Sequence, residues 1–233
     1  MMERVLAWGV HFFTSLGLVA AALMAVLIVR GGDDSFRAVF ALMLLATLID
    51  AVDGSLARLA RVKAVIPDFD GRRLDDIIDF HTYTSLPLLL LWRSGLLPGL
   101  WSVLLLFPLL ASVYGFSRSA AKTDDGYFLG FPSYWNIVAF YLYFLAPPCW
   151  FSAAAILVLS VLTFVPTRYL YATQPGGLNR ITNFLAAAWV VLLVWILAAK
   201  PEHRHSLAVA SLFFPVFYMT ASWWVSLTAR RTV

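Results

Sequence analysis

Four aspartates stand at fixed spacing in a chain that is otherwise strongly apolar: Asp50, Asp53, Asp75 and Asp79. Of the 233 residues, 61% are hydrophobic and 13% are charged, whereas soluble domains carry roughly 25% charged residues. Carboxylates at membrane depth are costly, so they usually face a cavity and serve a function there. We therefore expect an integral membrane protein whose chemistry is concentrated at these aspartates.

Eight apolar segments are each about long enough to cross a hydrocarbon core of ~30 Å. They are residues 5–29, 36–57, 74–92, 97–117, 132–148, 150–171, 181–199 and 206–228. The first segment stays apolar too far to be a cleaved signal peptide, so it is interpreted as a retained helix. These segments predict an all-α, polytopic bundle of about eight transmembrane helices that forms a single domain over residues 1–233.

The distribution of Lys and Arg predicts the orientation, because positive charge is enriched on the cytoplasmic side. With the N-terminus in the cytoplasm, twelve of the 17 basic residues fall on that side. They are Arg4, Arg58, Arg61, Lys63, Arg72, Arg73, Arg118, Lys122, Arg168, Arg180, Arg230 and Arg231. Both termini and the aspartates are therefore expected at the cytoplasmic face. Basic residues spread along membrane edges favour lipid headgroups or phosphates over nucleic acid as partners.

The spacing of the aspartates predicts that they converge. Asp50 and Asp53 are three residues apart at the end of one expected helix, and Asp75 and Asp79 are four apart at the start of the next. Residues at these spacings share a helix face, and antiparallel helices would oppose the two acidic faces. Repulsion among the carboxylates would be relieved by divalent cations. An all-oxygen set favours Mg²⁺ or Mn²⁺, with Ca²⁺ as an inhibitor or substitute, and two such ions about 4 Å apart would clamp a phosphoryl group.

Small residues and an arginine lie between the aspartates. Gly54 and Ala57 would let a bulky ligand such as a nucleotide approach the helix backbone, and Gly71 offers a second point of close approach. Arg58 offers a planar guanidinium for phosphate. Taken singly, each glycine is typical of a turn or a helix contact, but the combined pattern favours a ligand site.

The pattern Asp-x2-Asp-Gly-x2-Ala-Arg, followed by Gly-x3-Asp-x3-Asp, resembles the signature of the CDP-alcohol phosphatidyltransferases. All eight signature positions are present within residues 50–79. Twelve residues separate Arg58 from Gly71, where most members have about eight. That longer gap, the tract from Pro67 to Ile77 and the tract over residues 130–136 look like the bacterial phosphatidylcholine synthase branch.

The resemblance implies an enzyme of the bacterial inner membrane that transfers the phosphatidyl group of CDP-diacylglycerol to choline and releases CMP. It implies that Asp50, Asp53, Asp75 and Asp79 bind two divalent cations, Mn²⁺ or Mg²⁺, and that Asp79 is also the general base. The CDP site would be lined by Asp53, Gly54, Ala57, Arg58, Gly71 and Asp75. A homodimer is the family expectation.

Candidate contacts to choline and to the donor phosphate lie outside the signature. Aromatic faces bind quaternary ammonium groups, and the candidates near the expected cytoplasmic end are Tyr83, Tyr114, Tyr134 and Trp135. Arg118 and Lys122 are candidates for a donor phosphate, or they serve the positive-inside bias. Whether Asp68, Asp70 or Asp76 contacts the nucleotide is left open by the sequence.

Two other functions remain open at this point. The first is the same phosphatidyl transfer with serine, inositol or glycerol phosphate as the acceptor. An anionic acceptor such as glycerol phosphate would need further cationic side chains in the pocket. A divalent cation transporter would use the same acidic cluster, but it should also carry polar residues deep in other helices, and the last four expected helices offer few.

Overall fold

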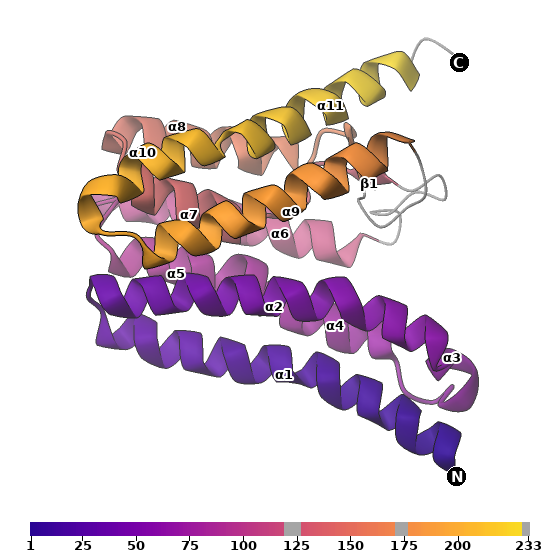
Figure 1. Cartoon of the computed structure of the whole chain (residues 1–233). Coiled ribbons are helices and arrows are strands. Elements are labelled where there is room, and N and C mark those ends of the chain that lie inside the picture. Colours follow the sequence, from indigo (N-terminus) through magenta and orange to yellow (C-terminus); the bar gives the residue numbers. More distant parts are fainter. Residues whose placement is uncertain (119–126, 171–176, 230–233) are drawn as a thin grey trace. The chain divides into compact units, whose positions relative to one another are not determined.

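The computed structural model describes residues 1–118, 127–170 and 177–229, which are almost entirely helical (Figure 1). They divide into two compact units, Met1–Gly95 and Leu96–Val233, each with its own internal contacts. The helical class predicted from the sequence is confirmed. All four aspartates of the signature belong to the first unit.

The first unit begins with a hairpin of two long helices, α1 (Met2–Arg30) and α2 (Asp33–Leu59). Gly31 and Gly32 join them with φ angles of 72° and 88°, a conformation that glycine adopts without steric cost. The buried face of α1 carries small and polar residues at helical spacing, including Ala7, His11, Thr14 and Gly17. The helices therefore approach closely along this face.

A third helical pass returns along the hairpin. The short helix α3 (Val62–Val65) precedes α4 (Gly71–Asp79), which continues through a π-helical segment η1 (Phe80–Ser85) into α5 (Leu86–Arg93). Asp70 caps α4 by accepting a 3.1 Å hydrogen bond from the backbone N–H of Arg73. The pass reaches the other end of the hairpin, because the Arg93 guanidinium lies 2.8 Å from where a Cβ on Gly31 would stand.

The π-helical segment has a cause in the sequence. Pro87 follows it and offers no N–H to the carbonyl of residue 83, and a proline ring clashes with the carbonyl four residues earlier. A widened turn relieves this conflict, and the backbone N–H of Leu86 donates to the oxygen of His81, five residues earlier. Such insertions are frequent at functional sites.

The second unit contains the remaining elements of the chain. They are η2 (Gly99–Leu105), α6 (Leu106–Ser117), β1 (Tyr127–Leu129), α7 (Trp135–Leu145), α8 (Cys149–Leu162), β2 (Arg168–Leu170), α9 (Gly177–Ala198), α10 (Pro201–Ser211) and α11 (Phe213–Ala229). Buried hydrogen bonds tie its core together: Trp189 donates to the Tyr141 hydroxyl at 2.8 Å, and that hydroxyl lies 2.8 Å from the Ser211 Oγ.

The two short strands qualify the all-α prediction. β1 and β2 pair antiparallel with Phe128 opposite Tyr169, so residues 168–170, which we expected to be helical, are extended. Pro166 explains the break, because the residue before a proline is disfavoured in the helical region. The pairing itself joins segments about 40 residues apart, which local periodicity does not reveal.

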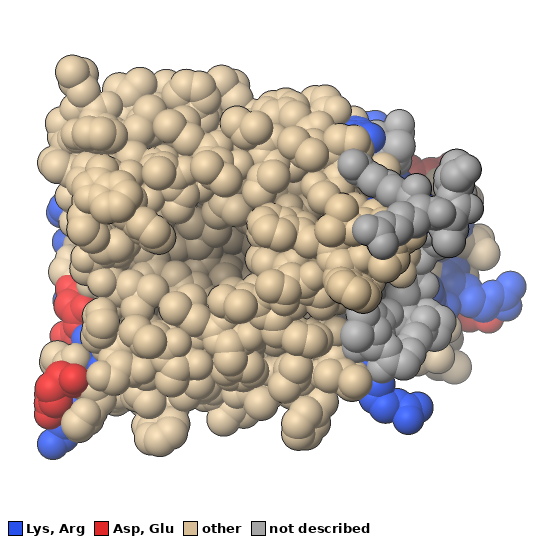
Figure 2. All heavy atoms as spheres, turned by 90° about the horizontal axis from the view of Figure 1, so that it is seen from above, with Lys and Arg blue, Asp and Glu red and all other residues tan. Residues whose placement is uncertain are grey.

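Five helical stretches among the described residues are long and apolar enough to cross a membrane. They are Met2–Arg30, Asp33–Leu59, Gly99–Ser117, Arg180–Ala198 and Pro201–Thr228, with Trp135–Leu145 and Cys149–Leu162 as shorter apolar helices. On the face drawn in Figure 2, most of the described surface consists of residues other than Lys, Arg, Asp and Glu. A multi-pass membrane protein follows, whereas the count of eight spans stays a prediction.

Candidate active site

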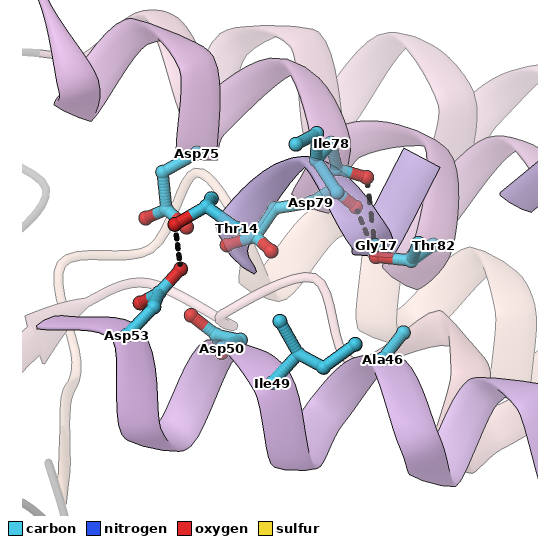
Figure 3. A pocket seen from close by; sticks show the side chains of 10 residues that line it. All are labelled: Thr14, Gly17, Ala46, Ile49, Asp50, Asp53, Asp75, Ile78, Asp79 and Thr82. Atoms are coloured by element: carbon cyan, nitrogen blue, oxygen red, sulfur yellow. Dashed lines mark hydrogen bonds between the residues drawn. The ribbon is translucent and has the colours of Figure 1, made fainter. Parts of the chain in front are cut away.

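Three carboxylates of the signature gather where α2 faces α4. Asp50, Asp75 and Asp79 each offer an oxygen, and these oxygens lie within 4.8 Å of one another. Figure 3 shows the side chains of Asp75 and Asp79 directed toward those of Asp50 and Asp53 on the facing helix. The convergence predicted from the spacing is thus present for these three residues.

Asp50, Asp75 and Asp79 line a pocket, the carboxylate pocket, and Asp53 lines it too. The immediate environment of Asp53 is different. Its side chain is buried, and its Oδ2 accepts a 2.8 Å hydrogen bond from the hydroxyl of Thr14 on α1 (Figure 3). It does not belong to the three-carboxylate group, which the structure assigns to Asp50, Asp75 and Asp79. The prediction that Asp53 is a metal ligand is therefore untested by this arrangement, whereas its place in the pocket is clear.

The donor set fits a small divalent cation. Mg²⁺ is held octahedrally by oxygens at about 2.0–2.1 Å, so its ligands lie at most about 4.2 Å apart. Because neighbouring ligands of an octahedral ion lie only about 2.9 Å apart, three carboxylate oxygens within 4.8 Å of one another would move closer together as they bind one. The same oxygens would repel one another strongly if they were charged and left without a cation.

Tyr83, predicted as a choline contact, lies beside this group. Its ring is buried, and its hydroxyl donates a 2.8 Å hydrogen bond to the Oδ2 of Asp50. Tyr83 follows Asp79 by one helical turn, so the spacing predicts that both residues face the same cavity, and the hydrogen bond to Asp50 agrees with this. What the sequence missed is the hydroxyl's partner, which lies 33 residues away on α2.

Gly54 and Arg58 lie at the end of α2 where space is available. A Cβ on Gly54 would meet no atom closer than the Arg58 Nη1 at 3.6 Å, so packing in the described part of the chain does not require glycine there. The side chain of Arg58 is exposed, and its Nη2 donates to the Ser55 hydroxyl at 3.0 Å. Both residues suit contact with an anionic ligand.

Gly71 and Ala57 have packing reasons for being small. A Cβ on Gly71 would stand 2.6 Å from Cε1 of the buried His11, whose ring also contacts Phe69 at a centroid distance of 4.5 Å. Ala57 packs against the apolar cluster of Ala7, Val62 and Ile66, which seats α3 on the hairpin. Part of the longer connection between Arg58 and Gly71 is thus packed on the hairpin through Val62 and Ile66, while the predicted CDP contacts of Gly71 and Ala57 stay predictions.

The open question of the neighbouring aspartates receives a partial answer. Asp70 acts as the cap of α4. Asp76 lies 4.0 Å from the guanidinium of Arg72, one turn earlier on the exposed side. Both positions are explained by helix stability, and neither residue lines the carboxylate pocket.

The remaining aromatic candidates belong to the second unit. Trp135 is fully buried and donates from Nε1 to the Ser112 hydroxyl at 2.9 Å, which gives it a core role. Tyr134 lies near Tyr218, with ring centroids 6.1 Å apart, and the half-exposed Tyr114 packs on Phe164.

The two candidates for the donor phosphate lie at the edge of the described structure. Arg118 ends α6 as its C-cap, and Lys122 lies outside the described residues. The phosphate contacts predicted for both residues are therefore untested.

Sequence reasoning overlooked the six other residues that line the pocket, which are Thr14, Gly17, Ala46, Ile49, Ile78 and Thr82. A signal existed on α1, where His11, Thr14 and Gly17 recur at helical spacing within an apolar helix. Polar and small residues on one stripe of a membrane helix indicate a face turned toward protein. Gly17 is required there, because a Cβ would stand 2.7 Å from Cγ2 of Ile78, beside Asp79.

The fold and the site define a class: a multi-pass helical membrane protein with a carboxylate pocket suited to a divalent cation. Comparison with known proteins identifies the family within this class. The phosphatidylcholine synthase of Pseudomonas aeruginosa is 34% identical over 199 residues, which cover 85% of this chain and 80% of the relative. The chain belongs to the phosphatidylcholine synthase family.

Other relatives agree. The phosphatidylcholine synthase of Legionella bozemanae is 41% identical over 77% of this chain and 89% of its own length. That of Legionella pneumophila is 32% identical over 94% of this chain and 88% of its own length. No model of a protein family matches the chain, so membership in the wider group of CDP-alcohol phosphatidyltransferases stays a prediction from the signature residues.

Proposed function

We propose that this chain is a CDP-diacylglycerol–choline O-phosphatidyltransferase. It would transfer the phosphatidyl group of CDP-diacylglycerol to the hydroxyl of choline, yielding phosphatidylcholine and CMP. The observation that carries the proposal is the grouping of Asp50, Asp75 and Asp79 in a chain whose relatives are named phosphatidylcholine synthases over most of its length.

Asp79 is proposed as the general base, on the family resemblance. Its carboxylate accepts the proton of the choline hydroxyl as the choline oxygen forms a bond to the phosphorus that bears diacylglycerol. The bond between that phosphorus and the bridging oxygen of the pyrophosphate breaks, and CMP leaves with the bonding electrons. Positioning and charge stabilisation supply most of the rate in such transfers.

The acidic residues are proposed to hold two divalent cations, Mn²⁺ or Mg²⁺. Asp50, Asp75 and Asp79 are supported by their geometry, and Asp53 by its place in the pocket. When bound, the cations would neutralise charge on the pyrophosphate and on the departing CMP. The role of the protein is to hold these carboxylates at a fixed spacing between two helices.

The nucleotide is proposed to lie along the end of α2. Gly54 is open to an approaching ligand, and the Arg58 side chain is exposed one turn further on. The choline pocket is proposed to include aromatic faces, for which Tyr114 and Tyr134 stay candidates. Removing the ring of either tyrosine should raise the KM for choline.

A matched pair of glycine substitutions tests the nucleotide site. Gly54→Ala should leave thermal stability intact, because its Cβ has ordinary contacts and alanine favours helix. It should raise the KM for CDP-diacylglycerol by about tenfold, which corresponds to about 1.4 kcal/mol, near the lower end of the roughly 1–3 kcal/mol that steric overpacking costs. Gly17→Ala, whose Cβ would stand 2.7 Å from Ile78, should instead lower the melting temperature. An unchanged donor KM in Gly54→Ala would remove the nucleotide from this position.

The acceptor is tested with purified protein, CDP-diacylglycerol and Mn²⁺ or Mg²⁺. Release of CMP is followed with choline, serine, inositol, glycerol 3-phosphate or no acceptor. We expect CMP and phosphatidylcholine to appear with choline alone. Turnover with another alcohol would keep the chemistry and change the acceptor. If folded protein that binds Mn²⁺ released no CMP with any acceptor, the proposed enzymatic function would be overturned and cation transport would be favoured.

The membrane location, orientation and oligomeric state of the enzyme are proposed from the sequence. The single domain would cross the bacterial inner membrane about eight times and act as a homodimer. Both termini and the carboxylate pocket would face the cytoplasm, as the distribution of basic residues indicates. Labelling of single cysteines at each terminus in intact cells, with Cys149 replaced, would test the orientation.

A further inference from the structure

Tyr83 is hydrogen-bonded to Asp50, a member of the three-carboxylate group. Its hydroxyl donates to the Oδ2 of Asp50 at 2.8 Å, and the residue is only 8% exposed. A phenol that is enclosed in this way has little aromatic face left for a ligand. Its chemistry is therefore directed at the carboxylate of Asp50.

The backbone explains how the hydroxyl reaches Asp50. Tyr83 lies in η1, the widened segment between Asp79 and Pro87, where the residues per turn exceed those of an α-helix. The consecutive residues Thr82, Tyr83 and Thr84 are all buried. The widened segment thus places Tyr83 against α2 in the turn that follows Asp79.

We propose that Tyr83 is a positioning residue that holds the Asp50 carboxylate in the orientation needed to bind a cation. This inference rests on the proposed function, whose metal site it deepens. A hydrogen bond to a charged carboxylate is stronger than a neutral one, and it restricts the rotation of that carboxylate before the cation arrives. Removing such a partner of a metal ligand typically costs 10–100-fold in metal affinity or activity.

Two substitutions separate this role from a direct contact with choline. Tyr83→Phe removes the hydroxyl but keeps the ring, and Tyr83→Leu removes both. If Tyr83 acts through Asp50, both variants lose Mn²⁺ affinity by about tenfold or more and keep the choline KM of the wild type. If the ring binds choline, Tyr83→Phe resembles the wild type and only Tyr83→Leu raises the choline KM.

The direct readout is Mn²⁺ binding to the purified protein without substrates, followed by the electron paramagnetic resonance signal of free Mn²⁺. Asp50→Asn serves as the reference for a damaged ligand. Tyr143→Phe, the same change on α7 in the second unit, serves as the control and should bind Mn²⁺ like the wild type. Melting temperatures of all variants separate a binding defect from unfolding.

A double variant completes the test. If Tyr83 acts only through Asp50, adding Tyr83→Phe to Asp50→Asn should cause little further loss of Mn²⁺ affinity, because coupled residues are not additive. Additive losses, or wild-type Mn²⁺ affinity in Tyr83→Phe, would overturn the inference and leave the proposed function intact. Absence of Mn²⁺ binding in the wild type would instead overturn the metal site itself.

Discussion

Replacing Asp79 with asparagine is expected to reduce CMP release by about three orders of magnitude, within the 10²–10⁴-fold that a general base contributes. The amide keeps the shape of the side chain, but it accepts no proton at neutral pH and carries no charge for a cation. Because Asp79 belongs to the three-carboxylate group, the substitution removes the general base and a cation ligand together, and both act in the transfer of the phosphatidyl group. The measurement is the initial rate of CMP release with saturating choline and CDP-diacylglycerol.

The control for Asp79→Asn is the same change at Asp34. That carboxylate is exposed at the start of α2, where it pairs with Arg37 at 3.1 Å, and an exposed pair of this kind contributes roughly 0–1 kcal/mol. Asp34→Asn should therefore retain wild-type turnover. Residual activity in Asp79→Asn close to that of Asp34→Asn would refute the assignment of Asp79 as base and ligand.

Removal of divalent cations should abolish turnover almost completely. Without a cation, the oxygens of Asp50, Asp75 and Asp79 would lie within 4.8 Å of one another as mutually repelling charges, and the charge on the pyrophosphate would have no counterion. We expect the rate to fall by at least about 100-fold after chelation, a loss of roughly 2.7 kcal/mol in barrier terms. Turnover is measured before and after passage over a chelating resin.

Restoration distinguishes metal loss from damage. Mn²⁺ or Mg²⁺ added back should recover the rate, whereas Ca²⁺ should not, because it prefers more ligands at longer distances of about 2.3–2.6 Å. Protein carried through the same steps without the resin provides the control. Undiminished turnover in protein that elemental analysis shows to be free of metal would contradict the proposed chemistry.

The composition of the site was largely predictable, because it depends on local spacing. Asp75 and Asp79 share a face by helix geometry, and Asp50 meets them because a short connection joins the two helices. The hydrogen-bond partner of Asp53 was not predictable. Its partner Thr14 lies 39 residues away on α1, and no local rule selects one hydroxyl on a neighbouring helix.

The same distinction holds for the aromatic residues. The sequence could place Tyr83 one turn after Asp79, but the hydrogen bond to Asp50 depends on the π-helical segment before Pro87. Trp135 was a choline candidate because it is an aromatic residue near an expected cytoplasmic helix end, yet it is buried and bonded to Ser112 on another helix. Residue type alone does not separate an aromatic ligand contact from a core residue that satisfies its own N–H.

For this protein, the sequence by itself determined the class of fold, the acidic signature and the kind of ion that an all-oxygen site prefers. These follow from hydropathy and from spacing along single helices, which are local properties. Only the tertiary structure decided which three carboxylates meet, which hydroxyls hold Asp50 and Asp53, and why packing within the protein requires a small residue at Gly17 but not at Gly54. Those facts arise where helices touch, and contacts between distant segments depend on the packing of the whole unit.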